Sequence, residues 1–313
     1  MDSILLSINV VFPLFVYMLL GFILKNINMV DNKALSSMNK LIYKVFLPIT
    51  LFLNVVSSNI TETFSTSILI YTVMSVLVLF ISLCMIIPKF EPDNKKASVI
   101  IQGTYRSNFV LFGITITASI CGAENMGMAT ILVTVVVPIF NILAVILFEM
   151  YQGTKINYKK VIKGVITNPL IIGSMLGLLV LLFKIKLPGL ILIPIKNISN
   201  ISTPLALIVL GGTFKFSGLK KYAVQIITAT LGKLVLVPSI FLTIAILLGF
   251  RGSNLVTLMV LFASPTAVSS YSMADQMGAD GELACYIVVM TSIFAIITIF
   301  GWTFTLNTLN LIN

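Results

Sequence analysis

Two polar stretches interrupt apolar segments of this 313-residue chain: residues 102–108 read QGTYRSN and residues 263–271 read ASPTAVSSY. Both contain small and hydroxyl side chains that weaken an α-helix, and Pro265 in the second stretch lacks the amide hydrogen that a helix interior needs. A broken helix exposes backbone groups, which a bilayer tolerates only inside protein or beside water. The stretches therefore predict two interrupted membrane helices around an internal site.

The composition of the whole chain indicates an all-α membrane protein. Hydrophobic residues make up 58% of the chain and charged residues 10%, whereas a soluble domain carries about 25% charged residues. So few charges could not cover the surface of a soluble fold of this size. We therefore expect a polytopic protein of the cytoplasmic membrane.

Histidine and cysteine usage excludes several classes of function. The chain has no histidine, so it has no zincin motif, His-based triad or histidine haem ligand. Cys84, Cys121 and Cys285 form neither a disulfide framework nor a CxxC metal site. We expect no metal, no cofactor and no enzyme. The net charge of +10 is explained by lysines on one side of a membrane rather than by nucleic-acid binding.

Ten segments have the length and apolar character of a membrane-crossing helix, which needs about 20 residues. They are residues 4–24, 34–56, 65–87, 97–120, 126–150, 168–184, 189–213, 222–248, 254–274 and 282–310. Most lysines fall in the odd-numbered connections between them, which the positive-inside rule places in the cytoplasm. Both termini are then expected outside the cell, and the connection at 151–167 inside it.

The two halves of the chain resemble each other at an offset of 156 residues. Pro13 falls on Pro169, Gly21 on Gly177, Pro48 on Pro204 and Gly122 on Gly278. Each half, 1–156 and 157–313, holds five predicted spans, and an odd number inverts the second half in the membrane. This is the inverted-repeat plan of secondary transporters. The interrupted segments are spans 4 and 9, which occupy equivalent positions.

Residues of the two interruptions are the predicted binding site. Ser107 and Asn108 from span 4, with Ser264, Pro265 and Thr266 from span 9, are expected to line one midplane cavity. Helix N-termini there would carry partial positive charge and free amides, which suit a carboxylate. Thr50 of span 2 is expected to close this cavity. The alternative is that these small residues only pack the helices closely.

Charged residues within the spans are the second set of candidates. Arg106 could attract an anionic substrate, extend to the cytoplasmic surface, or pair with Asp275. Lys233, near the middle of span 8, could serve as a fixed cation in the place of a coupling ion or could exchange a proton. Pairing with the backbone or with Glu149 is the remaining alternative for Lys233.

Several motifs resemble those of the auxin efflux carrier family. They are Leu47-Pro48, Asn168-Pro169-Leu170, Thr203-Pro204-Leu205-Ala206-Leu207 with Gly211-Gly212, Arg106-Ser107-Asn108, and residues 263–271 followed by Gly278-Ala279-Asp280. The chain resembles the bacterial branch of the family, whose members are mostly described as malate or malonate permeases. Pro265 matches the family motif of span 9, whereas Ser107 and Thr115 stand where the plant carriers have prolines in span 4.

This resemblance implies a fold, a mechanism and partners. The fold is the ten-helix plan shared with plant PIN carriers and bile-acid sodium symporters, in which helices 4 and 9 cross at the midplane. Spans 1, 2, 6 and 7 form a scaffold that dimerises, and spans 3–5 and 8–10 form a transport domain that moves by an elevator motion. The implied substrate is a small organic anion such as malate, malonate or an auxin-like carboxylate.

Three other functions remain open from the residues alone. A cation/proton antiporter needs intramembrane carboxylates, but Glu149 and Asp275 lie near the ends of their predicted helices. A sodium-coupled symporter of the same fold needs oxygen ligands for sodium, and the transport spans hold few carboxylates. A channel or receptor is the third, although equivalent broken helices favour alternating access.

Overall fold

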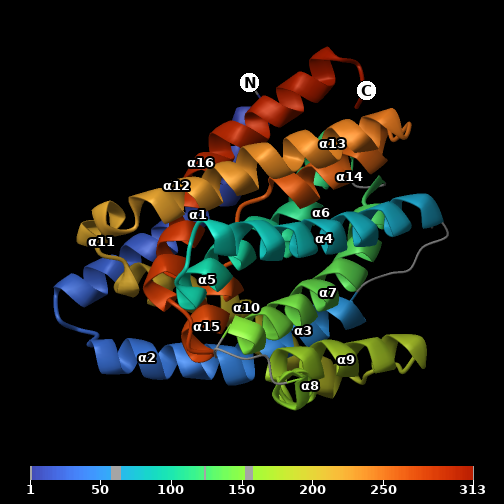
Figure 1. The fold of residues 1–313 in the computed structure, drawn as a ribbon. Coiled ribbons are helices and arrows are strands. Elements are labelled where there is room, and N and C mark those ends of the chain that lie inside the picture. Colours follow the sequence, from blue (N-terminus) through green and yellow to red (C-terminus); the bar gives the residue numbers. More distant parts are fainter. Residues whose placement is uncertain (1, 58–64, 123–124, 152–157, 313) are drawn as a thin grey trace.

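The chain is helical throughout the part that this computed structural model describes, namely residues 2–57, 65–122, 125–151 and 158–312 (Figure 1). The α-helices are α1 (Asp2–Asn26), α2 (Asn32–Leu41), α3 (Leu47–Val56), α4 (Thr66–Ile86), α5 (Asn94–Tyr105), α6 (Phe109–Cys121), α7 (Gly127–Tyr151), α8 (Tyr158–Thr167), α9 (Pro169–Leu182), α10 (Gly189–Thr213), α11 (Phe216–Lys221), α12 (Ala223–Leu231), α13 (Val237–Leu247), α14 (Gly252–Ala263), α15 (Ser269–Gln276) and α16 (Gly281–Thr308). No strand occurs in these residues apart from one isolated bridge between residues 107 and 266.

The helices have the length and apolar character of membrane spans, which establishes a polytopic helical membrane protein. Within the described residues, six qualify on length and composition. They are Asn32–Val56, Thr66–Lys89, Gly127–Tyr151, Gly189–Thr213, Ala223–Leu247 and Gly281–Thr308. A seventh possible span is α8 with α9, which bend by 58° at their junction. The remaining predicted spans fall on α1 and on two broken helices, α5 with α6 and α14 with α15.

Two of the long helices contain a π-helical turn directly before a proline. Residues Ile42–Phe46 join α2 to α3, and residues Gly232–Leu236 join α12 to α13. Pro48 and Pro238 follow at the start of the next α-helical segment. Proline has no amide hydrogen, and its ring clashes with the carbonyl four residues earlier. The wider π turn relieves that clash and lets each helix continue, as π-bulges in longer helices commonly do near functional sites.

One set of helices packs closely through small residues. α1 runs along α10, and α3 runs along α9 and α10. Gly211 of α10 allows a close approach, because a Cβ there would lie 1.9 Å from the backbone oxygen of Met18 in α1. Figure 1 shows α3, α8 and α9 gathered at one edge of the molecule, with α12 and α13 near the opposite edge.

Both predicted helix interruptions are present. α5 ends at Tyr105, where Arg106 adopts an extended conformation, and α6 begins at Phe109. α14 ends at Ala263, where Ser264 is likewise extended and precedes Pro265, and α15 begins at Ser269. Under the offset of 156 residues, residues 106–108 fall on residues 262–264, so the two breaks overlap at one residue. The interruptions predicted in residues 102–108 and 263–271 are therefore confirmed.

Candidate functional site

The two broken helices meet at their breaks. Ser107 and Thr266 face each other in an antiparallel bridge, and the backbone amide of Asn108 donates to the carbonyl of Pro265 over 2.8 Å. Pro265 has no amide hydrogen with which to donate back to α5 or α6, so the remaining hydrogen bonds between the two breaks come from the hydroxyls of Ser107 and Thr266. This arrangement places four half-helix ends together inside the protein.

Each break caps the carbonyl end of the other helix. The hydroxyl of Thr266 donates to the carbonyl of Gly103 in the last turn of α5, over 2.6 Å. The hydroxyl of Ser107 donates to the carbonyl of Leu261 in the last turn of α14. The last carbonyls of a helix have no partner within that helix, and leaving them unpaired in a bilayer costs several kcal/mol each. The exchange of hydroxyls across the crossing therefore stabilises both breaks.

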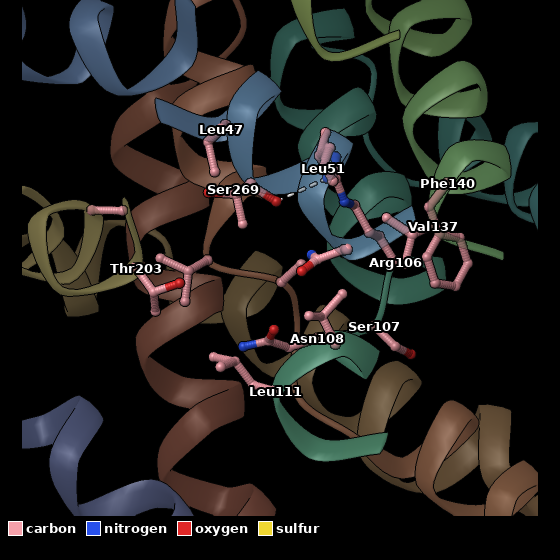
Figure 2. A pocket seen from close by; sticks show the side chains of 16 residues that line it. Leu47, Leu51, Arg106, Ser107, Asn108, Leu111, Val137, Phe140, Thr203 and Ser269 are labelled. Carbon is pink, nitrogen blue, oxygen red and sulfur yellow. Dashed lines mark hydrogen bonds between the residues drawn. The ribbon is translucent and has the colours of Figure 1, made fainter. Parts of the chain in front are cut away.

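A cavity of about 90 Å³ lies beside the crossing of the two broken helices, between them and helices α3 and α10 (Figure 2). It is lined by Leu47, Thr50, Leu51, Asn54, Arg106, Ser107, Asn108, Val110, Leu111, Val137, Phe140, Thr203, Ala206, Ala267, Val268 and Ser269. A water molecule needs roughly 10–15 Å³ by this measure, so the cavity has room for a small polar ligand or several waters. No carboxylate is among the lining residues.

Two helix N-termini reach this cavity. α6 begins after Asn108, and α15 begins after Val268, and neither preceding side chain caps its helix. The amides of the first turn have no acceptor within their own helix and carry roughly half a positive charge in sum. In α15 the amides of Ser270 and Tyr271 turn back to the carbonyls of residues 267 and 268. The first turn of α6 is therefore the better amide donor to a ligand.

Asn108 adds a donor that the protein does not use. Its side chain is 8% exposed, and its Nδ2 atom has no hydrogen-bond partner among the described residues. Figure 2 shows this amide near Thr203 and Leu111, across the cavity from Arg106 and Ser269. Leaving a buried donor unpaired costs about 1–3 kcal/mol. A ligand that accepts a hydrogen bond at this point would recover that cost.

Arg106 is held in place by neutral groups. One of its terminal nitrogens donates to Asn141 Oδ1 over 2.7 Å and to Ser269 Oγ over 2.8 Å, and the other contacts the sulfur of Met273. The side chain is buried, so it does not extend to the surface in this conformation. Within the described part of the chain, no carboxylate lies within 4.0 Å of it. Arg106 therefore has a positive charge with no ionic partner beside the cavity.

Lys233 lies behind the cavity, on the side of the carbonyl ends. It is 0% exposed, sits in the π turn between α12 and α13, and donates to the hydroxyl of Ser107. That hydroxyl in turn donates to Leu261. The ammonium is thus linked through Ser107 to the carbonyl end of α14, where a helix carries partial negative charge. Among the residues that the structure describes, its hydrogen-bond partner is Ser107, and it pairs neither with Glu149 nor directly with a backbone group.

The predicted site residues divide into two groups in space. Arg106, Ser107, Asn108 and Thr50 line the cavity. Ser264, Pro265 and Thr266 lie behind its wall, where they are bonded to Val260, Asn108 and Gly103, respectively.

Asp275 lies apart from the cavity. It accepts from Asn39 Nδ2 over 2.6 Å and from Gln276 over 2.9 Å. This carboxylate links α15 to α2 and does not pair with Arg106. It also lines a separate, polar pocket of about 290 Å³.

Four polar residues of the site were not predicted. Asn54, Thr203 and Ser269 line the cavity, and Asn141 orients Arg106. A signal was available for two of them. Asn54 lies four residues after Thr50 and therefore on the same helix face, and Asn141 is a polar residue in the middle of a mostly apolar helix. No such signal was available for Thr203 and Ser269, because their place in the cavity wall depends on how separate helices cross.

Comparison with known proteins agrees with this architecture. A model of the membrane transport protein family matches residues 6–303. The chain belongs to this family, the auxin efflux carriers. An uncharacterized transporter of Methanothermobacter thermautotrophicus is 22% identical over 311 residues, a match that covers 95% of this chain and 97% of the relative. The family resemblance drawn from the motifs is thus confirmed, and the protein is a multi-pass membrane transporter.

Proposed function

We propose that this protein is a secondary transporter that carries a small organic carboxylate anion by alternating access. The observation that carries the proposal is the cavity. It combines two uncapped helix N-termini, the unpaired charge of Arg106 and the free amide of Asn108, and its lining contains no carboxylate. Such a site attracts an anion and repels none of its oxygens.

The charge of the site favours a dicarboxylate over a monocarboxylate. Each helix N-terminus contributes roughly half a positive charge, and Arg106 contributes one. The sum is about two positive charges around a small cavity. A compact dianion of the malate or malonate class balances this charge, whereas an auxin-like carboxylate would balance half of it and would need more apolar room.

The packing supports an elevator mechanism on the ten-span, inverted-repeat plan. α1, α3, α9 and α10 pack against one another, as expected of a scaffold made of spans 1, 2, 6 and 7. The cavity lies between this group and the two broken helices. Movement of the broken helices along the scaffold would then carry the ligand with them. We infer a homodimer formed through the scaffold.

The orientation that we propose follows from the distribution of lysines between the predicted spans. Both termini lie outside the cell, and the 151–167 connection lies in the cytoplasm. Residues 152–157 of that connection, and with them the boundary between the repeats, are outside the described part of the chain.

Lys233 is proposed to replace a coupling cation. In transporters with broken helices, the carbonyl ends of the half-helices coordinate the coupling ion, which is sodium or a proton. Here an ammonium already occupies that side of the crossing, through Ser107. Transport then needs no sodium. Proton exchange by Lys233 and sodium coupling are the alternatives that the experiment separates.

Uptake into proteoliposomes tests the proposal. We expect purified protein to take up a labelled C3 or C4 dicarboxylate, chosen by a thermal-shift screen of small carboxylates. Preloading with unlabelled substrate should accelerate uptake, which a channel would not show. Uptake should be equal with and without sodium at two pH values. Uptake of monovalent cations but of no carboxylate would refute the proposal, and strict sodium dependence would refute the role of Lys233.

A further inference from the structure

The short helix α8 is fixed at an angle to the helix that follows it. α8 (Tyr158–Thr167) bends by 58° from α9 at Asn168 and Pro169. The side chain of Asn168 caps α9 by accepting from Leu170 N over 2.9 Å, and its amide donates to the hydroxyl of Tyr43 over 2.7 Å. Asn168 is buried. The direction of α8 is therefore set by a capped and anchored bend.

The residues of α8 divide into a charged and an apolar exposed side. Lys159 and Lys163, one helical turn apart, are exposed and pair with no acidic residue in the described parts of the chain. Ile162 and Ile166, also one turn apart, are 60% and 67% exposed. Lys160 lies 3.8 Å from Glu149 at the end of α7, which ties the helix to the rest of the protein.

The position of α8 follows from its own charge and from the length of α9. Three lysines in ten residues cannot lie in the hydrocarbon core, since each costs about 2.5–3.5 kcal/mol there. α9 has 14 residues and is therefore about 21 Å long, shorter than the core of about 30 Å. α9 therefore ends below the headgroups on the side of α8, and α8, inclined at 58° to α9, runs from there outward to the level where acyl chains meet headgroups.

We propose that α8 is an interfacial helix that binds anionic phospholipid. Lys159 and Lys163 contact the headgroup phosphates, and Ile162 and Ile166 insert among the first carbons of the acyl chains. This division of one helix into lysines and exposed aliphatic residues is what interfacial helices use on anionic membranes. The site is separate from the transport cavity and does not depend on which substrate is carried.

Lipid titration of the purified full-length protein tests this proposal. Binding of phosphatidylglycerol and of phosphatidylcholine is measured by native mass spectrometry. Each lysine near an anionic surface strengthens binding roughly fivefold, so the double variant Lys159→Gln/Lys163→Gln should bind phosphatidylglycerol roughly 25-fold more weakly. Its binding of phosphatidylcholine should not change.

A matched pair of lysines controls for loss of charge. Lys184 and Lys186 are exposed at the far end of α9, and Lys184→Gln/Lys186→Gln removes the same charge without touching α8. This variant should bind phosphatidylglycerol nearly as wild type does. Equal loss in both double variants, or none in either, would overturn the proposal.

The apolar half of the proposal has its own variant. Ile162→Ser/Ile166→Ser should weaken binding of both lipids, because insertion among acyl chains does not depend on the headgroup. All substituted side chains are exposed, so the unfolding temperature in lipid-free detergent should stay within error of wild type. Unchanged binding of both lipids by this variant would refute insertion.

Discussion

Replacing Arg106 tests the anion site most directly. A guanidinium has five N–H donors, and the contacts to Asn141, Ser269 and Met273 occupy three of them. Two remain, on two different nitrogens, as possible donors to substrate oxygens. A hydrogen bond to a charged group contributes about 1.5–3 kcal/mol, so Arg106→Ala should cost at least about 3 kcal/mol of substrate binding. At 1.4 kcal/mol for each factor of ten, the half-saturation concentration should rise roughly 100-fold.

Arg106→Lys should restore part of this loss. Lysine keeps the charge but does not hold its donors in the fixed plane of the guanidinium, which sets the directions of the remaining N–H groups. Its ammonium can still reach one protein partner and one substrate oxygen, so about half of the free energy should return. We expect a half-saturation concentration roughly tenfold above wild type.

The assay is concentration-dependent uptake of labelled dicarboxylate into proteoliposomes, normalised to inserted protein. Arg251→Ala is the matched control, because Arg251 is exposed and donates only to the carbonyls of Ile246 and Phe250 in the described structure. This variant should transport as wild type. Thermal unfolding separates folding from binding, since Arg106→Ala also leaves Asn141 and Ser269 without their donor.

One result would refute the reasoning. If folded Arg106→Ala takes up substrate with the half-saturation concentration of wild type, the arginine supports the structure and does not bind the anion. An equal effect of Arg251→Ala would point instead to a loss of general electrostatic attraction.

Three further predictions concern the fold and its motion. Lys233→Met should keep the fold, because an apolar side chain of similar length replaces a buried charge at little cost, yet abolish sodium-independent uptake; normal uptake would leave the lysine a packing role. Gly211→Ala should lower stability by about 1–3 kcal/mol, since its Cβ would lie 1.9 Å from the α1 backbone, while Gly301→Ala, with no neighbour within 4 Å, should not shift thermal unfolding. Asn39→Leu removes the donor to Asp275 and should increase hydrogen exchange in α15; unchanged exchange would exclude this bond as a restraint between α2 and α15.

The sequence predicted the helix breaks because their causes are local. Glycine, proline and hydroxyl residues weaken a helix wherever they occur, and the offset of 156 residues placed both breaks at equivalent positions. The structure accordingly ends α5 at Tyr105 and α14 at Ala263. The apolar segments likewise predicted where helices lie, because the thickness of the bilayer sets the length of a spanning helix and local composition shows which segments can cross it.

The wall of the cavity was predicted only in part, because it depends on how distant helices cross. Thr266 has a hydroxyl that could bind a ligand, but this hydroxyl donates a hydrogen bond to the carbonyl of Gly103. Ser269 was not among the predicted site residues, yet it accepts a hydrogen bond from Arg106, which lies 163 positions earlier in the chain. Sequence periodicity gives the face of one helix and not which other helix meets it, so these assignments needed the structure.

The exchange of hydroxyls between the two breaks has a consequence for biosynthesis. The carbonyl of Gly103 accepts a hydrogen bond from the hydroxyl of Thr266, which lies 163 residues later in the chain. When the break between α5 and α6 leaves the ribosome, the carbonyl of Gly103 does not yet have this hydrogen bond. The bond can form only after α14 and the residues that follow it have been synthesised. Until then, water or another protein must satisfy the carbonyl of Gly103. A chain truncated before Ser264 would lack Thr266 and would leave the carbonyl of Gly103 without this hydroxyl.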